Sequence, residues 1–177
     1  MKPIKSIVTF SVKQLVIISM LAICCILGYI SSSDRNTTAA NPLATTEELQ
    51  NPTKRKYRLT SKYGWRKQPI NGVKSFHNGE DYATPHGTKL YSPASGRVKR
   101  VFRNPVGGLQ VIIKHDNGFS TGYAHLSHVE VKAGDRVKSG EYFAKTGNTG
   151  YSTGPHLHLT LRNKKGKIVA PSEYLYK

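Results

Sequence analysis

The sequence has almost no cysteine. Its two cysteines, Cys24 and Cys25, are neighbours near the N-terminus, and residues 31–177 contain none. This excludes a disulfide framework, a cysteine zinc site and a cysteine nucleophile from that part of the chain. Any metal ion held there must be bound by histidine, aspartate or glutamate.

Acidic residues are also scarce. The chain of 177 residues has 27 Lys and Arg against 10 Asp and Glu, a formal net charge of +17. Three of the basic residues and none of the acidic ones precede Ser31, so the remainder, with 24 against 10, carries +14. A surface this basic favours anionic neighbours, which could be nucleic acid, anionic lipid or an anionic polymer of a cell wall.

A long apolar run occurs only once, from Leu15 to Ile30, and it follows a basic start. Its length is just below the roughly 17 to 20 residues that a membrane-spanning helix needs. We predict that residues 1–30 form an N-terminal signal peptide or signal-anchor helix, with cleavage left open. In either case the rest of the chain is exported, to the periplasmic or extracellular, cell-wall side. The membrane is a partner if the segment is retained.

Residues 31–56 are rich in Ser, Thr, Asn, Ala and Pro and show no periodicity, so we predict a linker. From Tyr57 onward no helical period exceeds two turns. Instead, β-prone runs are separated by Gly, Pro, Asn and Asp; they lie at 97–102, 109–114, 119–124, 141–145 and 157–162. We therefore expect residues 57–177 to form a mainly β domain, a sandwich or barrel. The expected core residues are Val98, Val101, Val111, Ile113, Val131, Val137, Phe143, Leu157 and Leu159.

Two of the seven histidines stand out by their spacing. His156 and His158 are two residues apart in an apolar run, and in a strand such residues point to the same face. His77 and Asp81 are four apart, but Gly79 between them argues against a helix. His77, Asp81 and one of the two later histidines would complete the three protein ligands of a catalytic zinc ion.

Each of these motifs is weak by itself. His156 and His158 could be two exposed residues of an edge strand, and Asp81 could be a turn residue. His125 lies in strand-like surroundings, where it could be half-buried with its ring hydrogen-bonded to backbone. His86, His115 and His128 lie near turn residues, so we expect them at the surface or around the site.

Six motifs in order carry a resemblance to a known family. They are Ser61–Arg66, His77–Ala83, Ser95–Val98, Tyr123–Leu126, Gly134–Val137 and Gly147–His158. Over roughly residues 60–175 the chain resembles the lysostaphin-type (LytM-type) zinc metalloendopeptidases, which cut peptide cross-links of bacterial peptidoglycan. The resemblance implies an antiparallel β-sheet core around a groove, related to lipoyl-domain-like half-barrels.

The resemblance also implies roles for five residues. His77, Asp81 and His158 match the ligands of one zinc ion (Zn2+), while His125 and His156 match the catalytic histidines. The implied reaction is attack of metal-activated water on a peptide cross-link, with either histidine as the base. The chain departs from the family pattern at Glu80, where an apolar residue is usual. It departs again at Leu159-Thr160, where an aromatic and an acidic residue often stand.

The sequence leaves functions other than hydrolysis open. A non-catalytic binder or activator of wall hydrolases, within an envelope or secretion complex, would not need this ligand set. A lipoyl-like carrier is disfavoured because Lys145 is followed by Thr146-Gly147 rather than by apolar residues. No RNA-binding aromatic motif or zinc finger occurs, so we expect no specific nucleic acid. The expected partners of a monomeric domain are peptidoglycan peptides and, through the basic surface, anionic wall polymers or envelope machinery. The sequence does not determine which peptide bond of the cross-link is cut.

Overall fold

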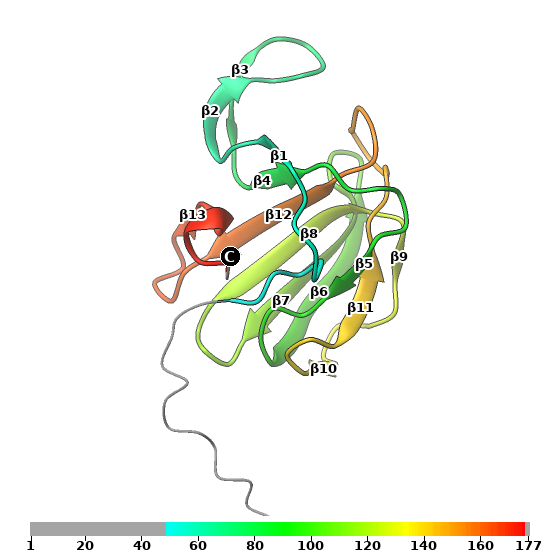
Figure 1. The fold of residues 1–177 in the computed structure, drawn as a ribbon, viewed down its shortest axis with the longest axis vertical. Helices are drawn as coiled ribbons and strands as arrows, with labels where there is room; N and C mark the ends of the chain where they lie inside the picture. The colour runs from blue at the N-terminus through cyan, green and yellow to red at the C-terminus, as the bar shows by residue number, and fades with distance from the viewer. Residues whose placement is uncertain (1–48, 176–177) are drawn as a thin grey trace, which may run out of the picture. The chain divides into compact units, whose positions relative to one another are not determined.

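The computed structural model describes residues 49–175, which form a mainly β structure (Figure 1). The strands are β1 (Leu59–Ser61), β2 (Gly64–Lys67), β3 (Lys74–His77), β4 (Glu80–Tyr82), β5 (Lys89–Tyr91), β6 (Gly96–Asn104), β7 (Gly108–His115), β8 (Ser120–Leu126), β9 (His128–Val129), β10 (Arg136–Val137), β11 (Tyr142–Lys145), β12 (Leu157–Arg162) and β13 (Ile168–Val169). A 3-10 helix, η1 (Pro171–Glu173), follows. The predicted helix within residues 1–30 lies outside the described residues, among which no helix is long and apolar enough to cross a membrane.

The main sheet has eight strands, in the order β1-β4-β12-β8-β7-β6-β10, with β13 paired to β12. All of its pairings are antiparallel, so the predicted fold class is confirmed for the described residues. Each of the five predicted runs coincides with a strand. Turn residues separate them as expected: between β7 and β8, the Asn117 side chain accepts a hydrogen bond from the Phe119 N–H, and Gly118 has a positive φ of 91°.

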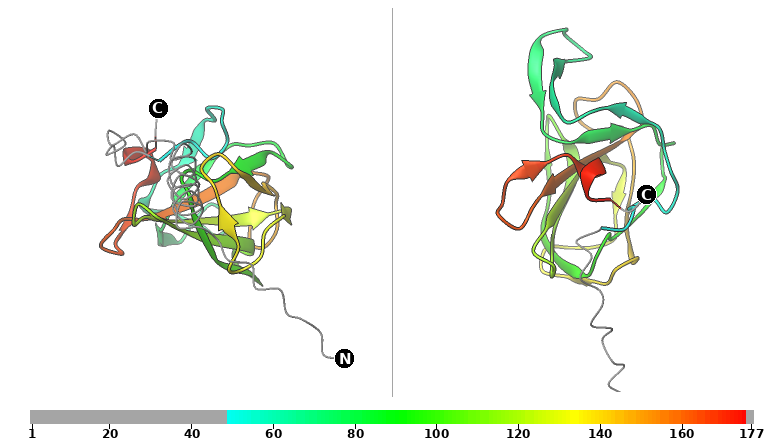
Figure 2. Two further views of the ribbon diagram at one scale, coloured as in Figure 1. Left: turned by 90° about the horizontal axis from the view of Figure 1, so that it is seen from below. Right: turned by 60° about the vertical axis from the view of Figure 1, so that its left-hand side comes forward.

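The core lies between this sheet and a smaller one of order β5-β11-β9; Figure 2 gives two further views of the ribbon. Tyr123 of β8 and Phe143 of β11 meet across it edge to face, with ring centroids 4.8 Å apart. Seven of the nine predicted core residues are buried, and Val101 and Val131 are partly buried against them. Side chains alternate along each strand, so the opposite face of the main sheet is free to carry a site.

Part of the predicted linker belongs to the folded body. Leu49 is fully buried with Phe119 and Leu161, and its N–H donates to the Tyr174 carbonyl at 2.9 Å. The stretch 49–56 therefore packs with the domain rather than spacing it from a membrane. A single leucine among polar residues has no periodicity, so the sequence could not reveal this contact.

Glu80 is buried without disturbing the packing. Its carboxylate accepts hydrogen bonds from the Tyr82 hydroxyl at 2.7 Å and from the Ser172 hydroxyl and N–H at 2.7 and 2.9 Å. Burial raises the pKa of Tyr82, and the nearby Glu80 raises it further. The unusual acid thus ties η1 to β4, on the core side of the strand.

The β2–β3 hairpin projects from the main sheet, at the top of Figure 1. Its register pairs Gly64 with His77 and Trp65 with Phe76. Trp65 and Phe76 stack edge to face and are largely exposed, 70% and 46%. The alternate residues, Arg66 and His77, point the other way and line a groove on the main sheet.

Candidate metal centre

The groove lies on the face of the main sheet that the core leaves free. It has a volume of about 450 Å³ and contains all five predicted site residues. Along β12 the odd positions, such as Leu157 and Leu159, are buried in the core, while His158 and Thr160 line the groove. The alternation predicted from the sequence therefore separates core from site on this strand.

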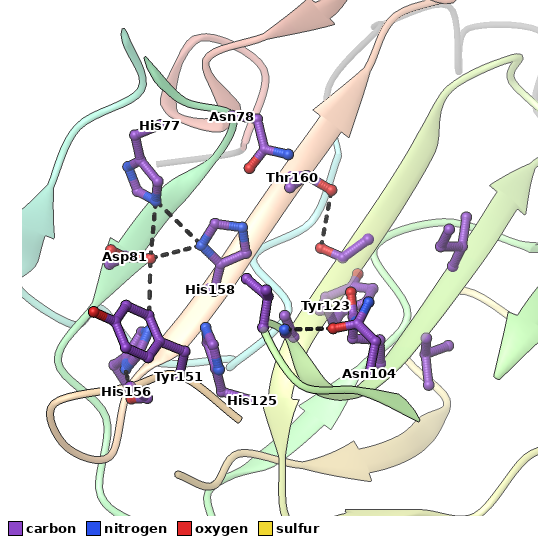
Figure 3. Close-up of a pocket in the computed structure, with 18 of the residues that line it drawn as sticks. His77, Asn78, Asp81, Asn104, Tyr123, His125, Tyr151, His156, His158 and Thr160 are labelled. Atoms are coloured by element: carbon purple, nitrogen blue, oxygen red, sulfur yellow. Dashed lines mark hydrogen bonds and ion pairs between the residues drawn. The ribbon is translucent and has the colours of Figure 1, made fainter. Parts of the chain in front are cut away.

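Three side chains converge at one end of the groove (Figure 3). Asp81 of β4 and His158 of β12 are directly opposite each other in the ladder, and His77 comes from the end of β3. The Asp81 Oδ1 atom is 2.8 Å from His158 Nδ1 and 3.2 Å from His77 Nε2. The two ring nitrogens are 3.2 Å apart. The three donor atoms thus form a compact triangle.

Close strand contact makes this triangle possible. Gly79 lies just before β4, and a Cβ at that position would be 2.4 Å from the Leu159 carbonyl oxygen. Any larger residue would push β4 away from β12, and Asp81 would move with it. Glycine between the two predicted ligands is therefore required by packing, not by a turn.

The donor set fits a zinc ion. Tetrahedral bonds of about 2.0–2.1 Å separate ligand atoms by about 3.3 Å, close to the observed spacings. His77 Nδ1 is 2.8 Å from the Lys62 carbonyl. Because a carbonyl only accepts, Nδ1 carries the proton and Nε2 offers its lone pair to the centre. Two imidazoles and one carboxylate leave room for a further ligand, as in catalytic zinc sites.

Asp81 is held in its ionised form. Burial by itself would raise its pKa, but the hydrogen-bonding contacts with the His158 and His77 rings, and the charge of either ring when it is protonated, bring the pKa well below its usual range. The outer oxygen, Oδ2, lies 3.6 Å from Arg66 Nη2. An anionic donor is therefore present at the centre at neutral pH.

Two more imidazoles stand beside the triangle. The His156 Nε2 atom is 3.7 Å from Asp81 Oδ1, and the rings of His125 and His156 are 4.8 Å apart between centroids. His156 Nδ1 is 2.8 Å from the Gly154 carbonyl, and His125 Nδ1 is 2.7 Å from the Thr149 carbonyl. Both histidines therefore carry their proton on Nδ1, which leaves each Nε2 able to accept one.

The backbone of His125 is unusual. Its φ of 58° is left-handed, which for a residue other than glycine costs about 1–3 kcal/mol. Its N–H donates to the Gly107 carbonyl at 2.8 Å, and its ring is fixed by Thr149. Burial lowers the pKa of His125, and protonation of His156 or His158 would lower it further, against the effect of the Thr149 hydrogen bond and of Asp81. The ring is thus fixed in place and neutral at pH 7.

The remaining histidines take no part in this cluster. His86 and His128 are exposed, and His128 pairs with Glu130 at 3.0 Å. The prediction for His115 was wrong. This residue lies neither at the surface nor around the site, but is buried in the body of the protein. Its ring bonds the Ala94 carbonyl at 3.0 Å and the Thr121 hydroxyl at 2.7 Å. Burial lowers the pKa of His115 to about 4.

Sequence reasoning missed two residues of the groove as candidates. Arg66 was noticed only as part of a motif, and Tyr151 only as part of a glycine-rich loop. Both line the groove that contains the five predicted site residues. The sequence did not predict the β2–β3 pairing that brings Arg66 to the site: Arg66 stands two residues from Gly64, which pairs with His77, so both side chains share one face of the hairpin.

Comparison with known proteins gives a consistent set of matches. The family model described as Peptidase family M23 matches residues 75–171. The chain is 43% identical over 101 residues to peptidoglycan DD-endopeptidase ShyB of Vibrio cholerae, a match that covers 56% of this chain and 24% of the relative. The chain thus spans about a quarter of the length of this curated relative.

Solved structures are also similar. A zinc-containing peptidase from Vibrio cholerae superposes with a TM-score of 0.59 at 36% identity, covering 70% of this chain and 38% of that one. The catalytic domain of the antimicrobial peptidase lysostaphin from Staphylococcus simulans gives a TM-score of 0.59 at 31% identity, covering 67% of this chain and 91% of that one.

Proposed function

Because this chain belongs to peptidase family M23, we propose that it is a zinc-dependent endopeptidase that hydrolyses peptide cross-links of bacterial peptidoglycan. The observation that carries the proposal is the donor triangle of His77, Asp81 and His158 beside two imidazoles with free Nε2 atoms. The name of the relative ShyB, a peptidoglycan DD-endopeptidase, supports the substrate class. The groove is lined by residues of β7, β8 and β12, and we expect an extended peptide to bind along it.

Each residue has a distinct role in this proposal. His77 Nε2, Asp81 Oδ1 and His158 Nδ1 would hold one zinc ion. When bound, zinc supplies a Lewis acid that lowers the pKa of a water molecule and polarises a carbonyl group. The Lys62 carbonyl keeps His77 in the tautomer that binds metal.

The two histidines outside the triangle handle protons. His156 Nε2 is 3.7 Å from Asp81 Oδ1, so it would be placed to accept a proton from a water molecule at the centre. The amine that leaves when the peptide bond breaks must receive a proton in turn, and an imidazole that has accepted one can donate it. His125, whose ring centroid lies 4.8 Å from that of His156, would be the second imidazole that carries a proton. The Gly154 and Thr149 carbonyls keep both rings aimed for this exchange.

We also propose that the domain acts outside the cytoplasm. The basic start and apolar run within residues 1–30 support export as a cleaved or anchored protein. Peptidoglycan lies on that side of the membrane, so the proposed location and substrate agree.

Muropeptide analysis tests the proposal. The chain is incubated with purified peptidoglycan, with and without a chelator, and the released products are identified by mass spectrometry. We expect new free amines from cut peptide bonds, none of them in the presence of chelator or with His158→Ala. New reducing sugars, or release that chelator does not affect, would mean another reaction. Wall binding without any release, unchanged in His125→Ala and His156→Ala, would favour the non-catalytic binder.

A further inference from the structure

A second hollow lies on the side of the domain opposite the groove. It has a volume of about 490 Å³ and is lined by residues of the stretches 53–57 and 85–91, none of which lines the groove. Leu90 of β5 is fully buried in the core, so its neighbours Lys89 and Tyr91 point to the outer face of the smaller sheet. The core therefore separates this hollow from the proposed metal centre.

The hollow is strongly basic. Its lining contains no acidic residue, and the basic residues in it are Lys54, Arg55, His86 and Lys89, all of them exposed. Within residues 49–175, neither the two lysines nor the arginine forms an ion pair. Positive charges gathered without a counter-charge repel one another and attract an anion.

The two lysines are held in place rather than free in solvent. Lys54 has a left-handed φ of 54°, a costly conformation that occurs mostly where a side chain must take a particular position. Its ammonium group lies 3.8 Å from the centroid of the Tyr91 ring, and the Tyr91 N–H donates to the Pro52 carbonyl at 2.7 Å. The Lys89 ammonium lies 5.7 Å from the centroid of the Tyr142 ring. The hollow thus presents ordered charges, unlike an ordinary solvated surface.

The shape of the hollow and its rings limit the kind of anion. A flexible chain can enter a concave site, whereas a flat membrane surface would meet only its rim. Tyr91 is half-buried and Lys54 covers a face of its ring, which leaves little room for stacking on a nucleobase. Ammonium and guanidinium groups pair well with phosphate oxygens. These features favour a flexible polymer that carries phosphate groups.

We propose that this hollow binds phosphate groups of an anionic polymer of the cell wall. The proposal goes beyond the endopeptidase function, because it concerns a second site and is independent of the reaction. It assigns the polymer expected from the basic composition to one part of the surface. Because the hollow and the groove lie on opposite sides of the core, a domain held in this way keeps its groove free for peptides.

Calorimetry with a short poly(glycerol phosphate) tests the proposal. The full chain is kept in a neutral detergent because of its apolar run, and uncharged polyglycerol should not bind. The double variant Lys54→Gln/Lys89→Gln should bind the phosphate polymer about 5- to 30-fold more weakly, as the loss of two charge pairs implies. Tyr91→Leu should also weaken binding although the charge is unchanged, because the ring beside Lys54 is lost, whereas Tyr91→Phe should bind like the parent chain.

Lys99→Gln/Lys132→Gln is the matched control. It removes the same charge from exposed residues outside the hollow and the groove, and it should change the affinity less than about twofold. An equal loss in the two double variants would mean that net charge alone attracts the polymer, and it overturns the proposal. Equal binding of uncharged polyglycerol overturns it as well.

Competition identifies the kind of ligand. A single-stranded oligonucleotide, or detergent micelles that contain phosphatidylglycerol, should displace the polymer only at a higher phosphate concentration. Displacement at a lower concentration would assign the hollow to nucleic acid or to a membrane and overturn the proposal. Because binding is measured without cleavage, failure here leaves the endopeptidase proposal intact, and failure of the muropeptide test leaves this one intact.

Discussion

The two histidines at positions 156 and 158 should fail in different ways when each is replaced by alanine. His158 Nδ1 lies 2.8 and 3.2 Å from the other two donor atoms, so His158→Ala removes a corner of the triangle. His156 Nε2 is 3.7 Å from Asp81 Oδ1, outside the triangle. We expect His158→Ala to lose zinc and activity together. His156→Ala should keep zinc and lose about 10²- to 10⁴-fold in kcat, the usual contribution of a general base.

The loss of zinc binding can be measured as a change in the thermal stability of the protein. A metal ion present at about 1,000 times its Kd stabilises the native state by about 4 kcal/mol. For a domain of this size that corresponds to a rise in Tm of roughly 15 °C. Addition of zinc should therefore raise the Tm of the parent chain and of His156→Ala by this amount, and leave that of His158→Ala unchanged.

The assay is a calorimetric melt of chelated and zinc-loaded protein, with metal content measured in the same samples. Because the two side chains are both half-buried, their alanine variants lose similar packing, and each serves as the other's control. The reasoning would be refuted if His156→Ala lost the zinc-dependent rise, or if His158→Ala retained it.

Three further predictions concern residues around the site. Gly79→Ala should destabilise the domain and weaken zinc binding, because its Cβ would lie 2.4 Å from the Leu159 carbonyl oxygen beside Asp81; metal titration of the variant checks this. Glu80→Ala should cost about 1–3 kcal/mol in urea unfolding, since the Tyr82 hydroxyl and the Ser172 hydroxyl and N–H lose their acceptor, and its zinc content should equal that of the control Glu80→Gln. The buried neutral His115 contributes stability that is present above pH 6.5 and lost as the pH falls toward about 4, in total about 3 kcal/mol. Unfolding of His115→Gln should depend less on pH across this range, and an unchanged pH profile would contradict the assignment.

Periodicity was enough to predict most of the fold. Along β12, for example, Leu157 and Leu159 could be assigned to the core and His158 to the opposite face from alternation. Single residues held by distant partners could not be predicted this way. Leu49 depends on contacts more than a hundred residues away, and His115 is buried because Ala94 and Thr121 happen to satisfy both its ring nitrogens. Local patterns contain no information about such partners.

The different roles of His156 and His158 follow from where β12 begins. The strand starts at Leu157, so His158 lies inside the ladder, with Asp81 on one side and Ala124 on the other. Its position is fixed by the sheet. His156 lies before the strand, where it makes only an isolated bridge to Gly147, and its ring is fixed by Gly154.

Two different parts of the structure therefore position the two functions. The sheet sets the spacing of the metal ligands, whereas the loop 147–156 sets the distance from His156 to the centre. That loop also supplies the Thr149 carbonyl that orients His125. Changes in the loop should consequently alter proton transfer and leave metal affinity intact, while changes in strand pairing should affect both. Insertion of one glycine within 151–153 separates these effects: it should lower kcat with zinc content unchanged, and a parallel loss of zinc would show that the loop supports the metal centre as well.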